Sequence, residues 1–257
     1  MIDSTFFLLL LTAHIIGDYY LQTDKIAQNK DNNKSYMWLH FVTYAFIFGL
    51  AFVAIGTLLS LILIGTVVLL HGIIDYTKAR LIVNRIFSKS EKDNENNSQI
   101  ILFIFDQAIH ILVIIIISVI YQNFVNKTEI VPWVREIFAY LNFPGGKLLR
   151  GVLLILMIYK PVNIAFIKLF NRFKPKIDSA EDPSQEKGGA TIGFLERLII
   201  IIFLYAQEYS AIGFILAAKS IVRYAKITEK KEFGEYYLIG TLFSTICALV
   251  LFYLIWN

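Results

Sequence analysis

The chain has 257 residues, of which 57% are hydrophobic and 17% are charged, against about 25% charged residues in typical soluble domains. Together with a mean hydropathy of +0.62, this composition excludes an ordinary soluble domain and indicates an integral membrane protein. The net charge of +4 lies mainly in polar loops, where it bears on topology and gives no nucleic-acid-binding signal. The single cysteine, Cys247, excludes an internal disulfide.

Apolar segments recur along the chain, at roughly 4–22, 38–57, 59–83, 99–122, 147–170, 193–224 and 234–256. We therefore expect an all-α fold, a polytopic integral membrane bundle with about six to eight membrane segments. The N-terminus lacks the basic region and cleavage site of a signal peptide, so the first segment is interpreted as a retained helix. The second and third segments meet at Gly56-Thr57, which requires a tight connection.

Polar loops are predicted at 23–36, 84–98 and 171–190, and each contains several lysines or arginines. Because short cytoplasmic loops are enriched in these residues, we expect a multi-pass protein of the bacterial inner membrane with its N-terminus outside. Segment 193–224 is too long for one span and is interrupted by a polar stretch at 207–210. A re-entrant hairpin there, with its turn at membrane depth, would return Lys226, Lys230 and Lys231 to the cytoplasmic side.

The segments suggest two regions. Residues 1–125 are predicted to form a four-helix membrane domain, and residues 126–257 a second membrane-helical region. Residues 133–140 at the start of the second region have the aromatic and charged pattern of an amphipathic helix lying at the membrane interface.

Histidine and aspartate residues four positions apart occur three times in the first region: His14 with Asp18, His71 with Asp75, and Asp106 with His110. Residues four apart lie on one helix face, so each pair presents an imidazole and a carboxylate together. The pairs and His40 lie at the ends of odd segments and the starts of even ones, which places all seven side chains in one layer near the cytoplasmic face.

Imidazole and carboxylate groups are the ligands that divalent transition metals favour. We therefore predict a site for one or two divalent ions, with zinc fitting best and manganese or iron as alternatives, built from His14, Asp18, His40, His71, Asp75, Asp106 and His110. Some of the seven could instead orient ligands from a second layer. Asp18, Asp75 and Asp106 are the candidate catalytic carboxylates, and Gln22, Lys78 and Gln107 the candidate substrate-binding residues.

This pattern predicts a metal-dependent hydrolase acting on a phosphoester or lipid-linked substrate, with the bilayer and a lipid or phosphorylated small molecule as partners. A metal-ion or proton-coupled transporter could use the same residues, and so could a protein whose metal is structural. The sequence leaves the oligomeric state open. It also leaves open whether the charged residues of the second region scaffold it through ion pairs or bind an anionic headgroup; these are Lys160, Glu196, Arg197, Lys219 and Arg223.

The strings 13–25, 71–78 and 105–110, together with His40, resemble an uncharacterised bacterial membrane-protein family, domain of unknown function 3307. The likeness covers roughly residues 5–120, and longer members of that family continue with strings like 193–197 and 211–220. The resemblance implies a helical membrane protein and supplies no activity. A looser likeness to bacterial inner-membrane families described as metal-dependent hydrolases rests on analogy of their histidine and aspartate residues.

Overall fold

The computed structural model describes residues 4–87, 95–140, 144–175, 183–229 and 231–256, and these residues contain helices and no strands. Six of the described helices are long and apolar enough to cross a membrane. The predicted all-α, polytopic helical bundle is therefore confirmed. The chain forms two compact units, Met1–Leu153 and Leu154–Asn257, which divide within α7 (Gly145–Phe170).

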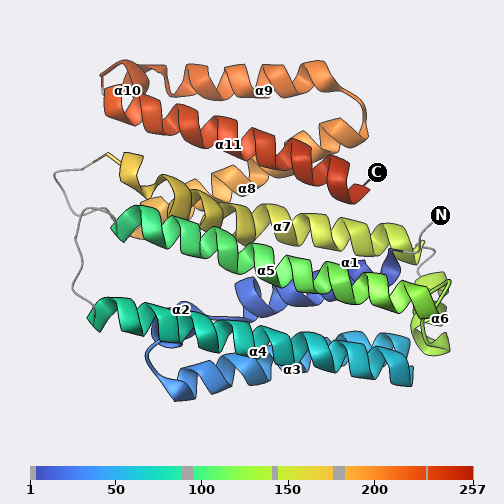
Figure 1. The fold of residues 1–257 in the computed structure, drawn as a ribbon. Coiled ribbons are helices and arrows are strands. Elements are labelled where there is room, and N and C mark those ends of the chain that lie inside the picture. The colour runs from blue at the N-terminus through green and yellow to red at the C-terminus, as the bar shows by residue number, and fades with distance from the viewer. Residues whose placement is uncertain (1–3, 88–94, 141–143, 176–182, 230, 257) are drawn as a thin grey trace. The chain divides into compact units, whose positions relative to one another are not determined.

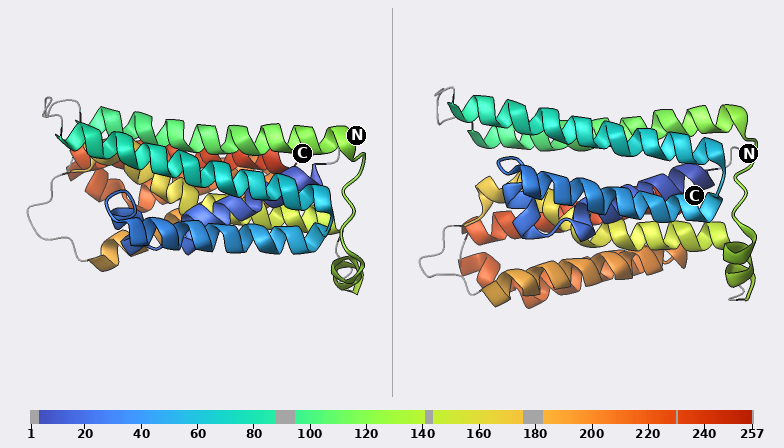
Figure 2. Two further views of the ribbon diagram at one scale, coloured as in Figure 1. Left: turned by 60° about the horizontal axis from the view of Figure 1, so that its bottom comes forward. Right: turned by 90° about the horizontal axis from the view of Figure 1, so that it is seen from below.

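The first unit is built around four helical segments. These are α1 (Thr5–Ile15) with its π-helical continuation η1 (Ile16–Leu21), α3 (Lys34–Ile55), α4 (Leu58–Phe87) and α5 (Glu95–Phe124). Figures 1 and 2 show α3, α4 and α5 running alongside one another, and α1 packs against both α3 and α5. A core of apolar side chains from these four segments holds the unit together.

The connection between α3 and α4 is tight, as predicted. Gly56 adopts a left-handed conformation with φ +70°, which glycine reaches without a steric penalty, and its N–H bonds to Phe52. Thr57 and Ser60 then start α4, because the side chain of each accepts the backbone N–H of the other at 3.2 Å. The chain thus reverses its direction between two long helices within two residues.

The predicted loop at 23–36 is not irregular throughout, since it contains a short helix, α2 (Asp24–Asn29). Thr23 lies at its N-terminus and accepts the N–H of Ile26, whose side chain is buried. The few apolar residues in this stretch gave no helical periodicity, although Thr23 followed by Asp24 is a helix-start signal. Helices α4 and α5 also extend into the predicted loop at 84–98.

Helix α6 (Pro132–Tyr140) forms where the amphipathic helix was predicted. Trp133, Ile137 and Tyr140 follow one another at helical spacing and are exposed. Its place at a membrane interface stays a prediction.

The second unit contains the rest of α7, the short 3-10 helix η3 (Asn171–Phe173), α8 (Pro183–Tyr205), α9 (Tyr209–Val222), α10 (Tyr224–Glu229) and α11 (Lys231–Trp256). Helix α8 packs against α11 and α9 (Figure 1). The chain reverses between Tyr205 and Tyr209, where the break in segment 193–224 was predicted. The ring of Tyr205 lies 5.5 Å from that of Trp256, so this turn lies level with the last turn of α11 and not with its middle. Lys230 lies outside the described residues.

Candidate metal centre

The structure brings all seven predicted metal-binding side chains together in the first unit. They come from four segments: His14 and Asp18 from α1 and η1, His40 from α3, the second pair from α4 and the third from α5. All four histidines are at most 3% exposed. The π-helix is part of this arrangement, because it widens the turn that carries Asp18 and places that carboxylate 3.7 Å from His14 Nδ1.

Two nitrogens of the cluster, His40 Nε2 and His71 Nε2, each lie near one oxygen of two aspartates, Asp18 Oδ1 and Asp75 Oδ2. The two Nε2 atoms lie 3.2 Å apart. His40 Nε2 lies 3.3 Å from Asp75 and 3.6 Å from Asp18, and His71 Nε2 lies 3.7 and 3.6 Å from the same oxygens. A tetrahedron of ligands about 2.0–2.2 Å from zinc has edges of about 3.3–3.6 Å. The three separations among His40, His71 and Asp75, from 3.2 to 3.7 Å, therefore match three ligand positions of one tetrahedral ion, and these residues form one group that could hold a metal.

A second group shares Asp75 and consists of Asp75, Asp106 and His110. The other oxygen of Asp75, Oδ1, lies 4.0 Å from His110 Nε2. His110 Nδ1 donates to the Asp106 carbonyl at 2.8 Å, and a carbonyl can only accept. The proton of the neutral ring is therefore on Nδ1, and the lone pair of Nε2 faces the cluster, which is the usual state of a metal-binding histidine.

His14, Asp18 and His71 form a third group within reach of one ion. His71 belongs to two groups and Asp75 to two, so the three groups form a chain and are not separate sites. These residues could hold a metal ion. A carboxylate readily shares its two oxygens between two ions, so Asp75 can serve two groups at once.

Tyr44 is a central residue that the sequence gave no reason to select. Its ring is stacked on His71 at 3.6 Å between centroids, and its hydroxyl lies 3.1 Å from His14 Nδ1. It fixes the orientation of two histidines from a third helix. Gly17 makes this possible, because a Cβ at that position would lie 2.6 Å from the Tyr44 ring, and Gly72 makes room for Phe41 in the same way. Both glycines lie beside a candidate ligand in the sequence.

Two lysines contact the carboxylates of the cluster. Lys78 lies 3.1 Å from Asp106 and 3.5 Å from Asp75. Lys30, which was interpreted only as part of a basic loop, is buried, and its Nζ lies 2.7 Å from Asp75 Oδ2. Lys30 also donates to Gln22 at 3.2 Å, which brings the predicted Gln22 to the edge of the cluster. By contrast, Lys25 is exposed and lies over the Tyr36 ring.

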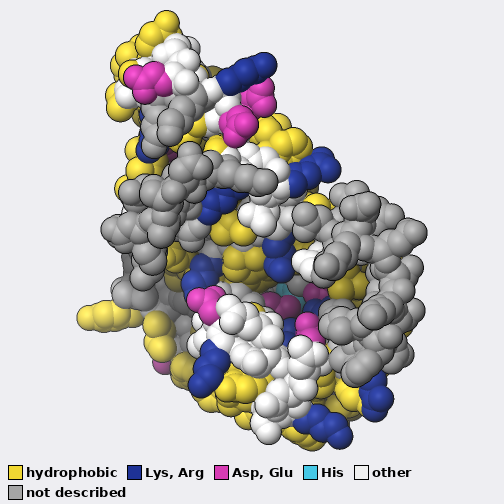
Figure 3. Space-filling view, turned by 90° about the vertical axis from the view of Figure 1, so that its left-hand side faces the viewer, with side chains coloured by type: hydrophobic (Ala, Val, Ile, Leu, Met, Phe, Trp, Pro, Cys, Tyr) yellow, Lys and Arg dark blue, Asp and Glu magenta, His cyan; other side chains and the backbone are white. Residues whose placement is uncertain are grey.

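Gln107, the remaining candidate for substrate binding, also lies at the cluster. It donates to Asp106 at 3.3 Å and accepts from the Tyr19 hydroxyl at 2.9 Å. Figure 3 looks onto the left-hand end of Figure 1: acidic side chains and a histidine are visible within a hollow of this face, and lysine and arginine side chains lie around it. Lys78 and Asp106 are the more exposed members, with 16% and 10% of their side chains accessible.

The cluster contains an unusual concentration of buried polar atoms without hydrogen-bond partners. Among the described residues nine such side-chain atoms occur, and six belong to the seven predicted ligands. Two of them, Asp18 Oδ1 and His110 Nε2, are atoms that face the metal groups described above. Because burying an unpaired polar group is costly, a cation bound beside Asp18 Oδ1 and His110 Nε2 would remove the part of the penalty that these two atoms carry.

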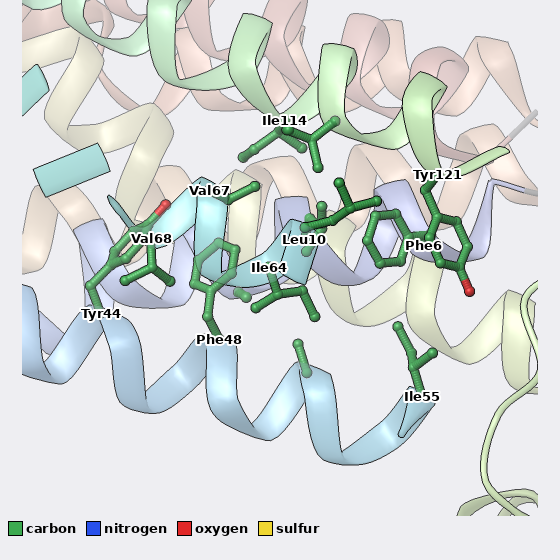
Figure 4. Packing of buried hydrophobic residues seen from close by; sticks show 14 residues of the cluster. Phe6, Leu10, Tyr44, Phe48, Ile55, Ile64, Val67, Val68, Ile114 and Tyr121 are labelled. Atoms are coloured by element: carbon green, nitrogen blue, oxygen red, sulfur yellow. The ribbon is translucent and has the colours of Figure 1, made fainter. Parts of the chain in front are cut away.

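On the other side of the cluster the interior is apolar. Figure 4 shows side chains from α1, α3, α4 and α5 filling the space between the helices, and the Phe6 ring stacks on Tyr121 at 3.8 Å. The hydroxyls of Thr12 and Ser118 in this part bond to carbonyls of their own helices. The described part of this layer is therefore packed mainly with apolar side chains.

The charged residues of the second unit make their own contacts. Arg197 is buried and bonds to the Ile158 carbonyl, Ser244 and Asn163 at 2.6–3.0 Å, which ties α8 to α7 and α11. Pro161 has no backbone N–H, so the carbonyl four residues before it, next to Ile158 in the sequence, lacks a donor within the helix. Glu196 pairs with Lys219 of α9 at 2.6 Å. These contacts join the helices of the second unit.

Fold and site together define a multi-pass helical membrane protein with a buried cluster of histidines and aspartates that could hold a metal ion. The chain belongs to the family described as protein of unknown function (DUF3307), whose model matches residues 6–138. The match includes all seven cluster residues and confirms the resemblance seen in the sequence. Comparison with curated proteins and with solved structures gives no match.

Proposed function

We propose that this protein is a membrane-embedded, metal-dependent hydrolase that acts on a phosphoester substrate, lipid-linked or soluble, from the cytoplasmic side of the inner membrane. Asp18, Asp75 and Asp106 are the catalytic carboxylates, as ligands or as bases for water. The observation that carries the proposal is the set of three donor separations, from 3.2 to 3.7 Å, among His40, His71 and Asp75.

Zinc is the ion that this donor set fits best. The two imidazole nitrogens and one carboxylate oxygen of this group have tetrahedral spacing and suit zinc, whereas manganese prefers more oxygen ligands. Asp75 directs its second oxygen toward His110, and Asp106 lies beside it, so a second ion sharing Asp75 has three protein ligands. Such a pair of ions stabilises both the attacking and the leaving oxygen of a phosphoryl displacement.

The hydrolysis needs a group that accepts a proton from water. Asp106 Oδ1 is buried and without a hydrogen-bond partner, and its side chain lies at the accessible edge of the cluster. In the proposed reaction a water gives its proton to Asp106 and its oxygen forms a bond to phosphorus. The bond from phosphorus to the alcohol oxygen breaks, and the leaving oxygen takes the proton from Asp106, which returns to its carboxylate form. A divalent ion assists by lowering the pKa of the water that it binds.

The apolar layer beyond the cluster favours a hydrolase over a transporter. A transported ion must leave through the opposite side of the bundle, where the core consists of side chains such as Phe6, Phe48 and Ile64. Since a charge within such a layer is costly, ions entering the cluster are expected to return the way they came. Purified protein in sealed vesicles is therefore expected to accumulate no zinc above empty vesicles, and uptake that depends on His71 would favour the transporter instead.

The proposal is tested by elemental analysis of the purified full chain and by release of inorganic phosphate from phosphoesters. Wild type is expected to hold one to two zinc ions per chain, while His71→Ala and Asp106→Ala hold less and have lost phosphate release. Ser118→Ala is the matched control, because Ser118 is a buried polar residue of α5 that bonds only to its own helix. Metal-free wild type, or equal metal in all four proteins, would overturn the metal site.

A further inference from the structure

Lys30 lies where an anionic substrate would meet a metal in the proposed site. Its ammonium group is 2.7 Å from Asp75 Oδ2, the same oxygen that faces His40 and His71. Lys78 stands on the other side of that carboxylate, 3.5 Å from Oδ1. The two ammonium groups therefore flank the residue that two metal groups share.

Each ammonium group has donor capacity left. A lysine carries three N–H donors. Lys30 contacts Asp75 and Gln22, and Lys78 contacts Asp106 and Asp75, with no third partner among the described residues. Holding a buried lysine with an unused donor is costly unless the donor meets an acceptor at some stage of function.

The charge of the cluster decides which ligand it can accept. Asp18, Asp75 and Asp106 face the two lysines, and Asp31 also acts on Lys78 electrostatically. Four carboxylates and two ammonium groups leave two negative charges when the histidines are neutral, so the site by itself repels an anion. One divalent ion cancels this charge and two ions reverse it to two positive charges, which complement a phosphate dianion.

We infer that Lys30 and Lys78 bind the terminal phosphate of a phosphomonoester dianion, and that they do so only when divalent metal is present. This inference rests on the proposed function and narrows its substrate class, since a diester offers one negative charge and no terminal phosphate. Lys30 directly follows α2 at its C-terminal cap, and buried Ile26 anchors that helix while Thr23 starts it, so the short helix positions a substrate-binding residue. The phosphomonoester is either soluble or the headgroup of a lipid.

The experiment is calorimetric titration of inorganic phosphate into zinc-loaded wild type, Lys30→Met and Lys78→Met. Loss of one charged donor from a buried anion site is expected to weaken phosphate binding about tenfold or more. Zinc content should stay at the wild-type level in Lys30→Met, because that change removes a positive charge next to a metal ligand. Lys25→Met is the matched control, since Lys25 lies in the short helix that Lys30 follows but is exposed over Tyr36. This variant should bind phosphate as wild type does.

The outcomes separate this inference from the proposed function. Wild type without bound zinc overturns both, and this is seen before phosphate is added. Wild type with zinc but without phosphate binding, or Lys30→Met with wild-type phosphate affinity, overturns the inference alone. A loss of zinc from Lys30→Met also overturns the inference, because Lys30 would then stabilise the metal site and not bind a substrate.

Competition with bound phosphate distinguishes the two possible sources of the phosphomonoester, a soluble compound and a lipid headgroup. Glycerol 3-phosphate in solution represents a soluble phosphomonoester, and phosphatidate in lipid nanodiscs represents a headgroup. Displacement by either one supports the inference and identifies the source, and displacement by neither overturns it.

Discussion

A single methyl group at Gly17 should disturb the metal site without removing any candidate ligand. A Cβ there would lie 2.6 Å from Cδ2 of Tyr44, whereas ordinary contacts are 3.4–4 Å, so the ring would have to move by about 1 Å. That ring is held between His71 and Phe48, at 3.6 and 4.6 Å between centroids. It cannot move without displacing a histidine.

The expected effect of Gly17→Ala follows from the cost of overpacking, about 1–3 kcal/mol. If about 2 kcal/mol of strain falls on the metal-binding geometry, the affinity for zinc falls about 30-fold. Competition of the purified protein with a chelator of known affinity measures this change, and thermal unfolding in detergent measures the loss of stability.

Two controls make the result decisive. Gly65→Ala in α4 adds the same methyl group where no neighbour lies within 4 Å, so zinc affinity should be unchanged. In a Tyr44→Ala background the clash is absent, and Gly17→Ala should then add little to the loss that Tyr44→Ala causes. If Gly17→Ala binds zinc as tightly as wild type, Tyr44 does not couple the helix packing to the histidines and the reasoning is refuted.

Two further predictions concern single residues. Asp75→Asn should lower the zinc content below that of Asp106→Asn, because Asp75 belongs to two of the three metal groups and Asp106 to one. Elemental analysis of the two variants measures this difference, and equal zinc contents would show that Asp75 is not shared. Arg197→Met should destabilise the protein by about 3 kcal/mol, since it removes three hydrogen bonds of a buried cation, while zinc content stays at the wild-type level. Thermal unfolding measures the stability and elemental analysis the zinc content. A loss of zinc would show that the metal site depends on the second unit.

Much of the fold could be predicted because membrane helices have a simple signature. A long apolar run can satisfy its backbone hydrogen bonds only as a helix, so the composition of residues 38–57 or 99–122 nearly suffices to define the element. The turn at Gly56 could also be predicted, because two long apolar segments meet at this glycine with no loop between them. Helix α2 was missed because it rests on one buried side chain, Ile26, and a capping residue.

Most residues of the candidate site could be predicted from the sequence for a related reason. Ionisable residues are rare within membrane segments, so His14, His71 and Asp106 stand out against their neighbours. The spacing of four residues gave each pair a common face, and the alternation of helix direction gave all of them a common depth. By contrast, Tyr44 and Lys30 carried no such signal, because an aromatic residue in a membrane helix and a lysine in a polar loop are both ordinary.

The sequence by itself determined that this chain is a helical membrane protein with one layer of histidines and aspartates, because the cost of burying polar groups in lipid allows few other outcomes. The rotation of the helices about their axes was decided only by tertiary packing: Gly17 and Gly72 allow Tyr44 and Phe41 to come close, and this aims His40 and His71 at one point. The π-helical turn at Asp18 and the contact between Lys30 and Asp75 are likewise products of packing. Helical periodicity defines a face, but contacts between helices decide which way that face turns.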